Sequence, residues 1–286
     1  MFDQLKRSCF FIRSGLPAMG ALALMAFAPP AMAASCGNGG AGFDGWLSQF
    51  SREASAQGVS GEALAALNGV TYDPQVIRLD RGQHSFKLSF EAFYARRVND
   101  ALIRRGQRLI AAHRGTFDRI EKRYGVPPSI IASIWGLETN YGALGGKMSI
   151  IRSIATLAYD CRRTAFFQNE LMSALKIVQR GDMSPTQLRG GWAGEIGQTQ
   201  FLPSAYYKYA VDFDGDGGRD LIHSVPDMLA STANYLRSYG WQPGQSWSPG
   251  TANYGVIREW NKAEVYVKTI GVMASKMENS SRAASN

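Results

Sequence analysis

One glutamate in this sequence lies where a carboxylate is uncommon, on the apolar side of a predicted helix. The segment Pro128 to Thr139 begins with proline, which favours the first turn of a helix, and its apolar residues follow helical spacing. Glu138 falls at position i+7 of the apolar stripe, after Ile131, Ile134 and Trp135 at i, i+3 and i+4. Burial and a nearby helix C-terminus both raise the pKa of a carboxyl group. Such an acid could protonate the leaving oxygen in glycoside cleavage.

Spacing alone leaves other interpretations of Glu138 open. It could form a buried ion pair with an arginine, or it could merely flank the turn at Asn140 to Gly142. A second candidate acid is Glu195, in a Gly- and Asp-rich segment from Gly190 to Ser224. Because loops framed by helices commonly carry function, we expect this segment to form part of the site.

The Asp-rich part of that segment fits the opening of a calcium-binding loop. Asp212, Asp214 and Asp216 occupy positions 1, 3 and 5, and glycine follows at position 6. Position 12 is His223 instead of the usual glutamate, so Asp227 would have to close a structural Ca²⁺ site. Alternatively, Asp227 belongs to the first turn of a helix that Ser224 caps. No cofactor is expected to be required for activity.

Several blocks of the sequence, in order, resemble one family. Those blocks are Trp135 to Gly142, Gly190 to Ser204, Tyr209 to Gly217, Ala233 to Leu236 and Gly240-Trp241. Together they resemble the membrane-bound lytic transglycosylase B family, a lysozyme-like group. The resemblance implies a mainly α, lysozyme-like catalytic domain with little β structure, and a cleft between the Glu138 helix and the segment Gly190 to Asn261.

The resemblance also implies an activity. The enzyme would cleave the β-1,4 bond between N-acetylmuramic acid and N-acetylglucosamine in peptidoglycan and leave a 1,6-anhydromuramic acid end. Glu138 would act as the single acid and base, assisted by the N-acetyl group of the substrate. The alternatives are a hydrolytic muramidase or chitinase with a second carboxylate, and a non-catalytic peptidoglycan-binding protein.

By the same resemblance, five residues would bind the sugar: Gln200, Tyr235, Trp260, Asn261 and Tyr266. Trp260 stands where tyrosine is expected, and Gly191 stands where some relatives carry a hydroxyl. A glutamine satisfied within its loop and aromatic residues in the core are the plainer alternatives.

Helical spacing predicts several helices along the chain. They are Phe43 to Ala56, Ser89 to Arg97, Asp100 to Tyr124, Pro128 to Thr139, Thr164 to Gln179, Val225 to Tyr239 and Lys262 to Met277. The catalytic region is expected to span 34–277, and the polar tail 278–286 is expected to be disordered. The pairs Arg96-Arg97 and Arg104-Arg105 are interpreted as solvated helix faces.

The N-terminus has the pattern of a signal peptide over residues 1–33. Basic residues precede an apolar stretch, and Ala31-Met32-Ala33 has the form of a cleavage site. We therefore expect export to the periplasm, with a membrane anchor and a lipidated Cys36 as weaker alternatives. Cleavage would lower the net charge from +8 to +6 by removing three cations and one anion.

An expected location in the periplasm decides which state of the cysteines and which partners we expect. Cys36 and Cys161 would remain after cleavage, and we expect a disulfide between them, the alternative being two separate buried thiols. The expected partners are peptidoglycan glycan strands and cell-wall synthesis or secretion machinery, with the protein itself a monomer. Nucleic acid is excluded because no known binding module or basic stripe is visible.

Overall fold

The computed structural model describes residues 36–82 and 88–283, which are mainly helical. The mainly α fold class is therefore confirmed. The expected signal peptide over residues 1–33 lies outside the described residues. In the described part of the chain, no helix combines the length and the apolar character needed to cross a membrane.

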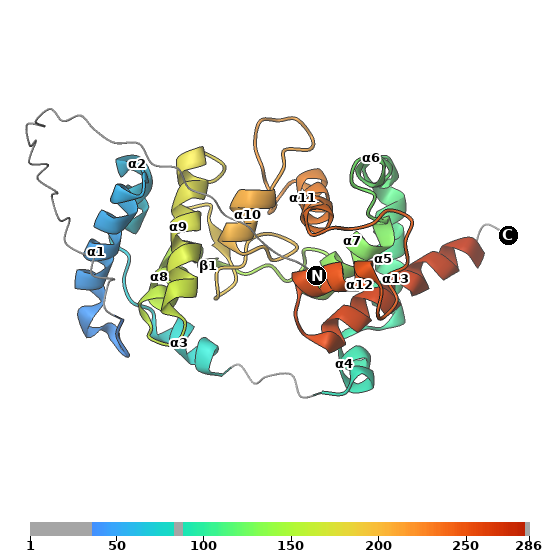
Figure 1. Cartoon of the computed structure of the whole chain (residues 1–286), viewed down its shortest axis with the longest axis horizontal. Helices are drawn as coiled ribbons and strands as arrows, with labels where there is room; N and C mark the ends of the chain where they lie inside the picture. The colour runs from blue at the N-terminus through green and yellow to red at the C-terminus, as the bar shows by residue number, and fades with distance from the viewer. Residues whose placement is uncertain (1–35, 83–87, 284–286) are drawn as a thin grey trace, which may run out of the picture. The chain divides into compact units, whose positions relative to one another are not determined.

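The helices form two groups, and α10 lies between them (Figure 1). In the first group, the N-terminal helices pack against α8 and α9. Its members are α1 (Phe43–Ala56), α2 (Gly61–Leu64), α3 (Pro74–Arg81), α8 (Ile150–Tyr159) and α9 (Thr164–Arg180), with short 3-10 helices at Gly40–Gly42 and Ala65–Leu67.

In the second group, helices surround α7, which contacts α5, α6, α11 and α13. Its members are α4 (Phe90–Arg97), α5 (Asp100–Ala112), α6 (Arg114–Tyr124), α7 (Pro128–Thr139), α11 (Val225–Ser238), α12 (Ala252–Trp260) and α13 (Glu264–Ala283). The helix α10 (Pro203–Tyr209) contacts both α9 and α11 and so connects the two groups.

The described residues contain one small sheet. Strands β1 (Met148–Ser149) and β2 (Arg189–Gly190) pair antiparallel, with Met148 opposite Gly190. A Cβ at Gly146 would lie 2.1 Å from the carbonyl oxygen of Gly190, so glycine is needed for this close approach. The sheet connects the chain after α7 to the Gly-rich segment.

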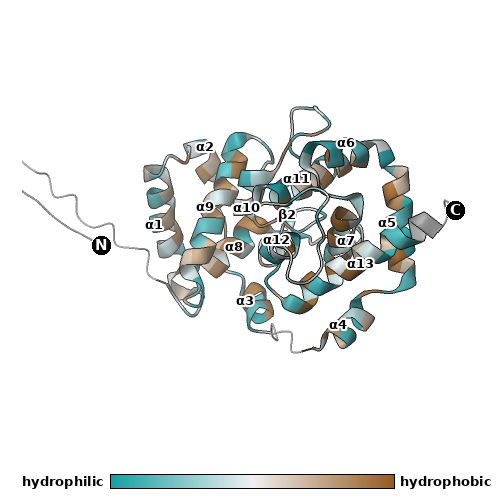
Figure 2. Cartoon of the chain, turned by 45° about the vertical axis from the view of Figure 1, so that its right-hand side comes forward, coloured by the Kyte–Doolittle hydropathy of each residue, from teal (hydrophilic) through white to brown (hydrophobic). Residues whose placement is uncertain are grey.

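Amphipathic patterning explains most of the helices that the sequence predicts. In α1, the buried residues are Phe43, Trp46, Leu47, Phe50 and Ala54, which follow helical spacing. Figure 2 shows the resulting alternation of hydrophobic and hydrophilic residues around α1. The bounds of α1 and α7 match the prediction, whereas α2, α3, α8, α10 and α12 were not predicted.

Two predicted boundaries are wrong. The helix predicted over Asp100 to Tyr124 is interrupted at His113, because α5 packs against α7 and α13 while α6 packs against α11. The tail expected to be disordered from residue 278 instead continues α13 to Ala283. No glycine or proline interrupts this stretch, and the Ser129 hydroxyl donates a 2.8 Å hydrogen bond to Glu278.

A disulfide joins Cys36 to Cys161, with the two Cα atoms 4.9 Å apart. Next to it, the amide of Gly37 donates to the carbonyl oxygen of Tyr159. The side chain of Tyr159 packs on Phe43 and Trp46 of α1. The start of the described chain is thus fastened to the end of α8.

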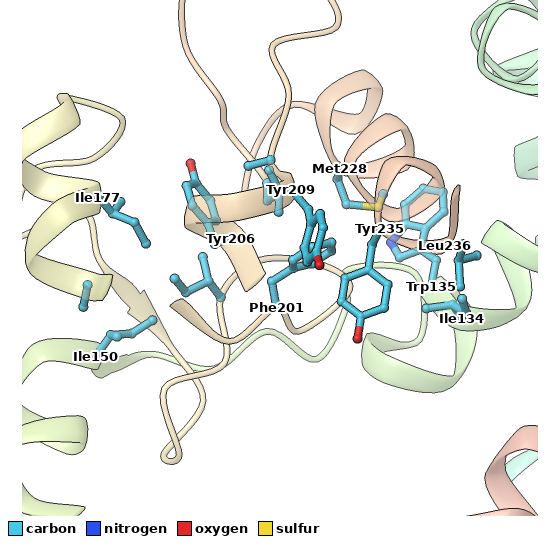
Figure 3. Close-up of a cluster of buried hydrophobic side chains, with 14 of the residues drawn as sticks. Ile134, Trp135, Ile150, Ile177, Phe201, Tyr206, Tyr209, Met228, Tyr235 and Leu236 are labelled. Carbon is cyan, nitrogen blue, oxygen red and sulfur yellow. The ribbon is translucent and has the colours of Figure 1, made fainter. Parts of the chain in front are cut away.

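The buried core reaches the Gly-rich segment. Ile134 and Trp135 of α7 lie near Leu236 of α11, and Phe201 lies beside Tyr235 (Figure 3). These side chains are buried, so the loop that carries residues 190–202 rests on the same core as the helices. The loop is thereby held against α7.

Candidate active site

Glu138 lies near the end of a helix that is buried on almost every side. In α7, residues Ser129 to Leu137 and Thr139 are all buried, so the stripe expected from the sequence extends around most of the helix. A helix that is apolar all round belongs in a protein interior. Glu138 itself is half-buried, and its carboxyl group lies deep among protein atoms.

The turn after Glu138 has an uncommon backbone. Asn140 and Tyr141 adopt φ values of 49° and 57°, and Gly142 follows with φ 80°. A left-handed conformation costs a non-glycine residue about 1–2 kcal/mol, so surrounding contacts must hold it. Tyr141 supplies them: it is buried, its hydroxyl donates to Leu102 O at 3.0 Å, and its ring packs on Trp135.

Two donors converge on one oxygen of the Glu138 carboxyl group. Trp260 Nε1 donates to Oε1 at 3.1 Å, and the Tyr266 hydroxyl donates to the same Oε1. No hydrogen bond from a described residue reaches Oε2. The two oxygens are therefore inequivalent, and a proton on the carboxyl group belongs on Oε2, because Oε1 is already accepting two hydrogen bonds.

Opposing effects act on the protonation of Glu138. Desolvation by burial raises its pKa most strongly. The hydrogen bonds from Tyr266 and Trp260 and the charge of Arg97 lower the pKa, while the carboxylate of Glu195 raises it. The net direction is upward, which favours an acid that keeps its proton at higher pH than an exposed glutamate does.

Gln198 fastens the Gly-rich segment to α7, a role that was not predicted from the sequence. Its side-chain oxygen accepts a 3.0 Å hydrogen bond from Trp135 Nε1, and its amide nitrogen donates to Ile222 O at 2.9 Å. Its backbone carbonyl also accepts from the Thr139 hydroxyl at 2.6 Å. The block Gly190 to Ser204 indicated this region, but no spacing rule singles out Gln198 within it.

A pocket of about 610 Å³ opens beside Glu138, bounded by the Gly-rich segment, α9, α11 and the end of α12. Of the predicted sugar-binding residues, four line it: Gln200, Tyr235, Trp260 and Asn261. Phe166 and Tyr239, which are 45% and 40% exposed, add aromatic surface to this pocket. Aromatic faces and amide groups together suit a sugar with acetamide substituents.

These four residues are held in different ways. Gln200 has a φ of 58°, and its side-chain nitrogen donates to Gly197 O at 2.8 Å. The Asn261 side-chain oxygen accepts from the amide of Ala263, and the Tyr235 hydroxyl donates to Glu259 O. Tyr235 and Asn261 thus fix the segment that carries Trp260.

Tyr266, the fifth predicted sugar-binding residue, contacts Glu138 directly. It is buried behind Glu138, bonds to the carboxyl group and lines neither of the two pockets that Glu138 lines. The contact with Glu138 adds a role that the motif did not indicate, because the motif marks a position in the sequence but not the direction in which its side chain points. The predicted sugar contact of Tyr266 stays a prediction.

Glu195, the other candidate acid, lines the 610 Å³ pocket with Glu138. Burial raises its pKa, and one carboxyl oxygen accepts a 3.0 Å hydrogen bond from the amide of Ala193. A Cβ at Gly191 would lie 2.2 Å from that same oxygen. The Glu195 side chain thus occupies the space beside Gly191, which explains why this position carries no hydroxyl side chain here.

A second pocket, of about 600 Å³, also has Glu138 in its wall. Arg96 and Arg97 of α4 and Arg105 and Arg108 of α5 line it. The guanidinium group of Arg97 donates to Leu137 O at 2.6 Å, directly before Glu138. Three arginines interpreted from the sequence as a solvated face, Arg96, Arg97 and Arg105, therefore border the candidate site.

The four predicted metal ligands converge at the start of α11. Asp212, Asp214, Asp216 and Asp227 each offer an oxygen within 4.8 Å of the others, whereas His223 is exposed and outside the cluster. Ser224 also caps α11, since its hydroxyl accepts from the amide of Asp227. Asp227 therefore belongs both to the cluster and to the first turn of the helix.

Comparison with known proteins agrees with the family that the motifs indicated. Residues 42–251 match a protein family model described as the transglycosylase SLT domain. Over 122 residues, 42% of this chain, the sequence is 43% identical to membrane-bound lytic murein transglycosylase B of Escherichia coli K12. That match spans only 34% of the E. coli protein.

Solved structures show the same fold. SltB3 from Pseudomonas aeruginosa, in complex with NAG-anhNAM-pentapeptide, superimposes with a TM-score of 0.78 and 32% identity, covering 82% of this chain and 79% of SltB3. The soluble lytic transglycosylase SltB1 from the same species gives a TM-score of 0.76 and 25% identity, covering 82% and 98%. The resemblance that the sequence motifs indicated is confirmed.

Proposed function

This chain belongs to the transglycosylase SLT domain family, and on that premise we propose that it cleaves the glycan strands of peptidoglycan as a lytic transglycosylase. The observation that carries the proposal is the Glu138 carboxyl group, which has a raised pKa, two donors on one oxygen, and a place in the walls of two pockets. Such a group can serve as acid and then as base. Support also comes from SltB3, whose structure holds NAG-anhNAM-pentapeptide.

In the proposed reaction, the bond between C1 of N-acetylmuramic acid and the oxygen of the following N-acetylglucosamine breaks. Glu138 gives the proton on Oε2 to that oxygen, and the N-acetyl oxygen of the muramoyl residue bonds to C1. Glu138, now a carboxylate, removes the proton from O6, and O6 displaces the N-acetyl oxygen at C1. The product is a 1,6-anhydro end, and Glu138 regains its proton.

The protein's own groups would support each step. Trp260 and Tyr266 would stabilise the carboxylate that forms when the proton leaves, because both donate to Oε1. Gln200, Tyr235, Trp260 and Asn261 would hold the sugar in the 610 Å³ pocket. No second acid is needed in this scheme, so Glu195 is assigned to the pocket wall.

Product analysis tests the proposal. The mature protein and its Glu138→Gln variant are incubated with purified peptidoglycan, and the soluble products are identified by mass spectrometry. Anhydro-muropeptides from the wild type alone are expected. Reducing-end products that a Glu195→Gln variant no longer makes would instead show hydrolysis with Glu195 as the second carboxylate, and binding without any product would indicate a non-catalytic protein.

We also propose that the protein is exported and acts in the periplasm. The Cys36–Cys161 disulfide supports this, since disulfides form and persist in oxidising compartments. The monomeric state and a partnership with cell-wall synthesis or secretion machinery stay predictions. Fractionation of cells, with detection of the processed chain, tests the location.

We propose further that Asp212, Asp214, Asp216 and Asp227 hold a structural Ca²⁺. Four carboxylates within 4.8 Å repel one another unless a cation balances them, and no ion pair with a described lysine or arginine does so. Ca²⁺ is expected to raise the melting temperature of the wild type and to bind in calorimetry, whereas Mg²⁺ has a smaller effect. An Asp216→Asn variant should weaken both responses; an unchanged wild-type melting temperature with no heat of binding would exclude the site.

A further inference from the structure

The pocket on the α4 and α5 side of Glu138 is strongly basic. Its lining residues include the four arginines Arg96, Arg97, Arg105 and Arg108, and Glu138 is the only acidic residue among them. None of the four forms an ion pair with a described acidic side chain. The positive charge of this pocket is therefore unbalanced within the described protein.

Two of these arginines have structural contacts. Arg97 donates to Leu137 O, and the guanidinium group of Arg105 lies 5.5 Å from the centre of the Tyr141 ring. Both contacts hold the end of α7 and the turn that follows it. Arg96 and Arg108 are exposed at the pocket and have neither kind of contact, so their guanidinium groups are the ones available to a ligand.

The ligand that suits this pocket is a carboxylate. The planar guanidinium group of arginine binds carboxylates through two parallel hydrogen bonds, and several arginines in one pocket select anionic over neutral groups. The hydroxyl and acetamide groups of a neutral sugar would not need this charge. Leu144, which is 70% exposed, also lines the pocket and offers apolar surface beside the arginines.

We propose that this arginine pocket binds carboxylates of the peptide stem carried by the muramoyl residue at Glu138. The inference rests on the proposed function, because it needs peptidoglycan as the substrate. Peptide stems combine carboxylates with small apolar side chains, which matches the arginines and Leu144. The arginine pocket would thus set a preference for peptide-substituted strands over bare glycan.

Kinetics on three forms of the same strands test the inference. They are uncrosslinked glycan strands with free stem carboxylates, the same strands with those carboxylates amidated, and strands from which an amidase has removed the peptides, leaving the lactyl carboxylate. The enzymes are the wild type, the double variant Arg96→Gln/Arg108→Gln, and Arg104→Gln. Arg104 is the matched control because it is exposed on the same helix, α5, but does not line the pocket.

On intact strands, the double variant is expected to raise KM about fivefold with little change in kcat, as two partly exposed charge pairs would do. Amidation should raise the wild-type KM to a similar extent and abolish the difference between wild type and double variant. Arg104→Gln should behave as the wild type on all three strands.

Other results would overturn the inference. If Arg104→Gln raises KM as much as the double variant does, the effect comes from the general charge of the protein. If the double variant still raises KM on amidase-treated strands, the pocket binds the lactyl carboxylate and not the peptide. The same comparison can be made by measuring binding of the strands to Glu138→Gln backgrounds, which needs no turnover. Failure of the proposed function would instead appear as absence of anhydro products from the wild type on every strand.

Discussion

Trp260 Nε1 donates a 3.1 Å hydrogen bond to Oε1 of Glu138, across 122 residues of sequence. An indole N–H can donate but never accept, so this contact favours the carboxylate over the protonated acid. It therefore counteracts part of the effect of burial on the pKa of Glu138. The contact also directs the proton of the acid form to Oε2.

Replacing Trp260 with phenylalanine removes this donor but keeps an aromatic ring. The pKa of Glu138 should rise further, because a contact that stabilises its ionised form is lost. In the proposed reaction the free enzyme needs protonated Glu138, so the decline of kcat/KM at alkaline pH should move to higher pH. A pH profile of kcat/KM on peptidoglycan strands measures this.

The control for that experiment is Trp260→Tyr, whose hydroxyl can donate in place of the indole. The alkaline decline of its kcat/KM should stay closer to that of the wild type. If the alkaline decline of kcat/KM in Trp260→Phe moves to lower pH, or does not move, the contact between Trp260 and Glu138 does not lower the pKa of Glu138.

Replacing Glu138 with glutamine should stabilise the fold while lowering activity by at least about 10²-fold. Burial raises the pKa of Glu138 in the folded protein above the ordinary value of a glutamate, so the folded protein keeps a proton that the unfolded chain loses. Stability is therefore lost as pH rises above the unfolded pKa, and the variant avoids this loss. Near neutral pH we expect a gain of about 1 kcal/mol in the free energy of unfolding.

The pH dependence makes this prediction specific. At about pH 4, where the carboxyl group is largely protonated in both states, the variant and the wild type should unfold alike. Thermal unfolding at the two pH values measures the difference. If the variant is more stable than the wild type by the same amount at both pH values, packing and not the charge of Glu138 is responsible. Glu62→Gln, at an exposed glutamate, serves as control.

The sequence predicts best those features that depend on neighbouring residues. The bounds of α7 follow from Pro128 at its start and the left-handed Asn140 at its end, and both are local signals. By contrast, α12 depends on distant contacts: the buried Asn253 side chain bonds to the backbone of Gln242 and Gln245. The buried Tyr254, Val256 and Ile257 span barely one turn of this nine-residue helix, which is too short a pattern to reveal it in the sequence.

In the candidate site, too, local features could be predicted from the sequence and distant contacts could not. Glu138 has a local argument, since its position on an apolar helix is visible in the sequence. Tyr266 lies 128 residues away from it, and only the packing of α13 against α7 brings its hydroxyl to Oε1. The arginine pocket is a further case, because the sequence contains two similar pairs and only the fold separates Arg105 from Arg104.

Removing the disulfide should destabilise the fold strongly. Cys36 and Cys161 are 125 residues apart, and a crosslink that closes so long a loop restricts the unfolded chain. The double variant Cys36→Ser/Cys161→Ser should lose about 2–5 kcal/mol in the free energy of unfolding, measured with urea. A reductant should destabilise the wild type similarly and leave the double variant unchanged. Equal stability of the oxidised wild type and the variant would contradict this.

Replacing Gln198 with alanine should loosen the contact between α7 and the Gly-rich segment. Trp135 Nε1 and Ile222 O would lose their partner, and an unsatisfied buried polar group costs about 1–3 kcal/mol. Because Trp135 is three residues before Glu138, we expect kcat to fall as well. Urea unfolding and kcat on peptidoglycan strands measure the two effects.

The matched control for Gln198 is Gln187, which is exposed and whose side chain accepts hydrogen bonds from Ser184 within its own turn. Gln187→Ala should change stability by less than about 0.5 kcal/mol and leave kcat unchanged. If Gln198→Ala lowers kcat without lowering stability, Gln198 contacts the substrate instead of positioning α7. If neither quantity changes, the contact between Trp135 and Gln198 does not hold the site together.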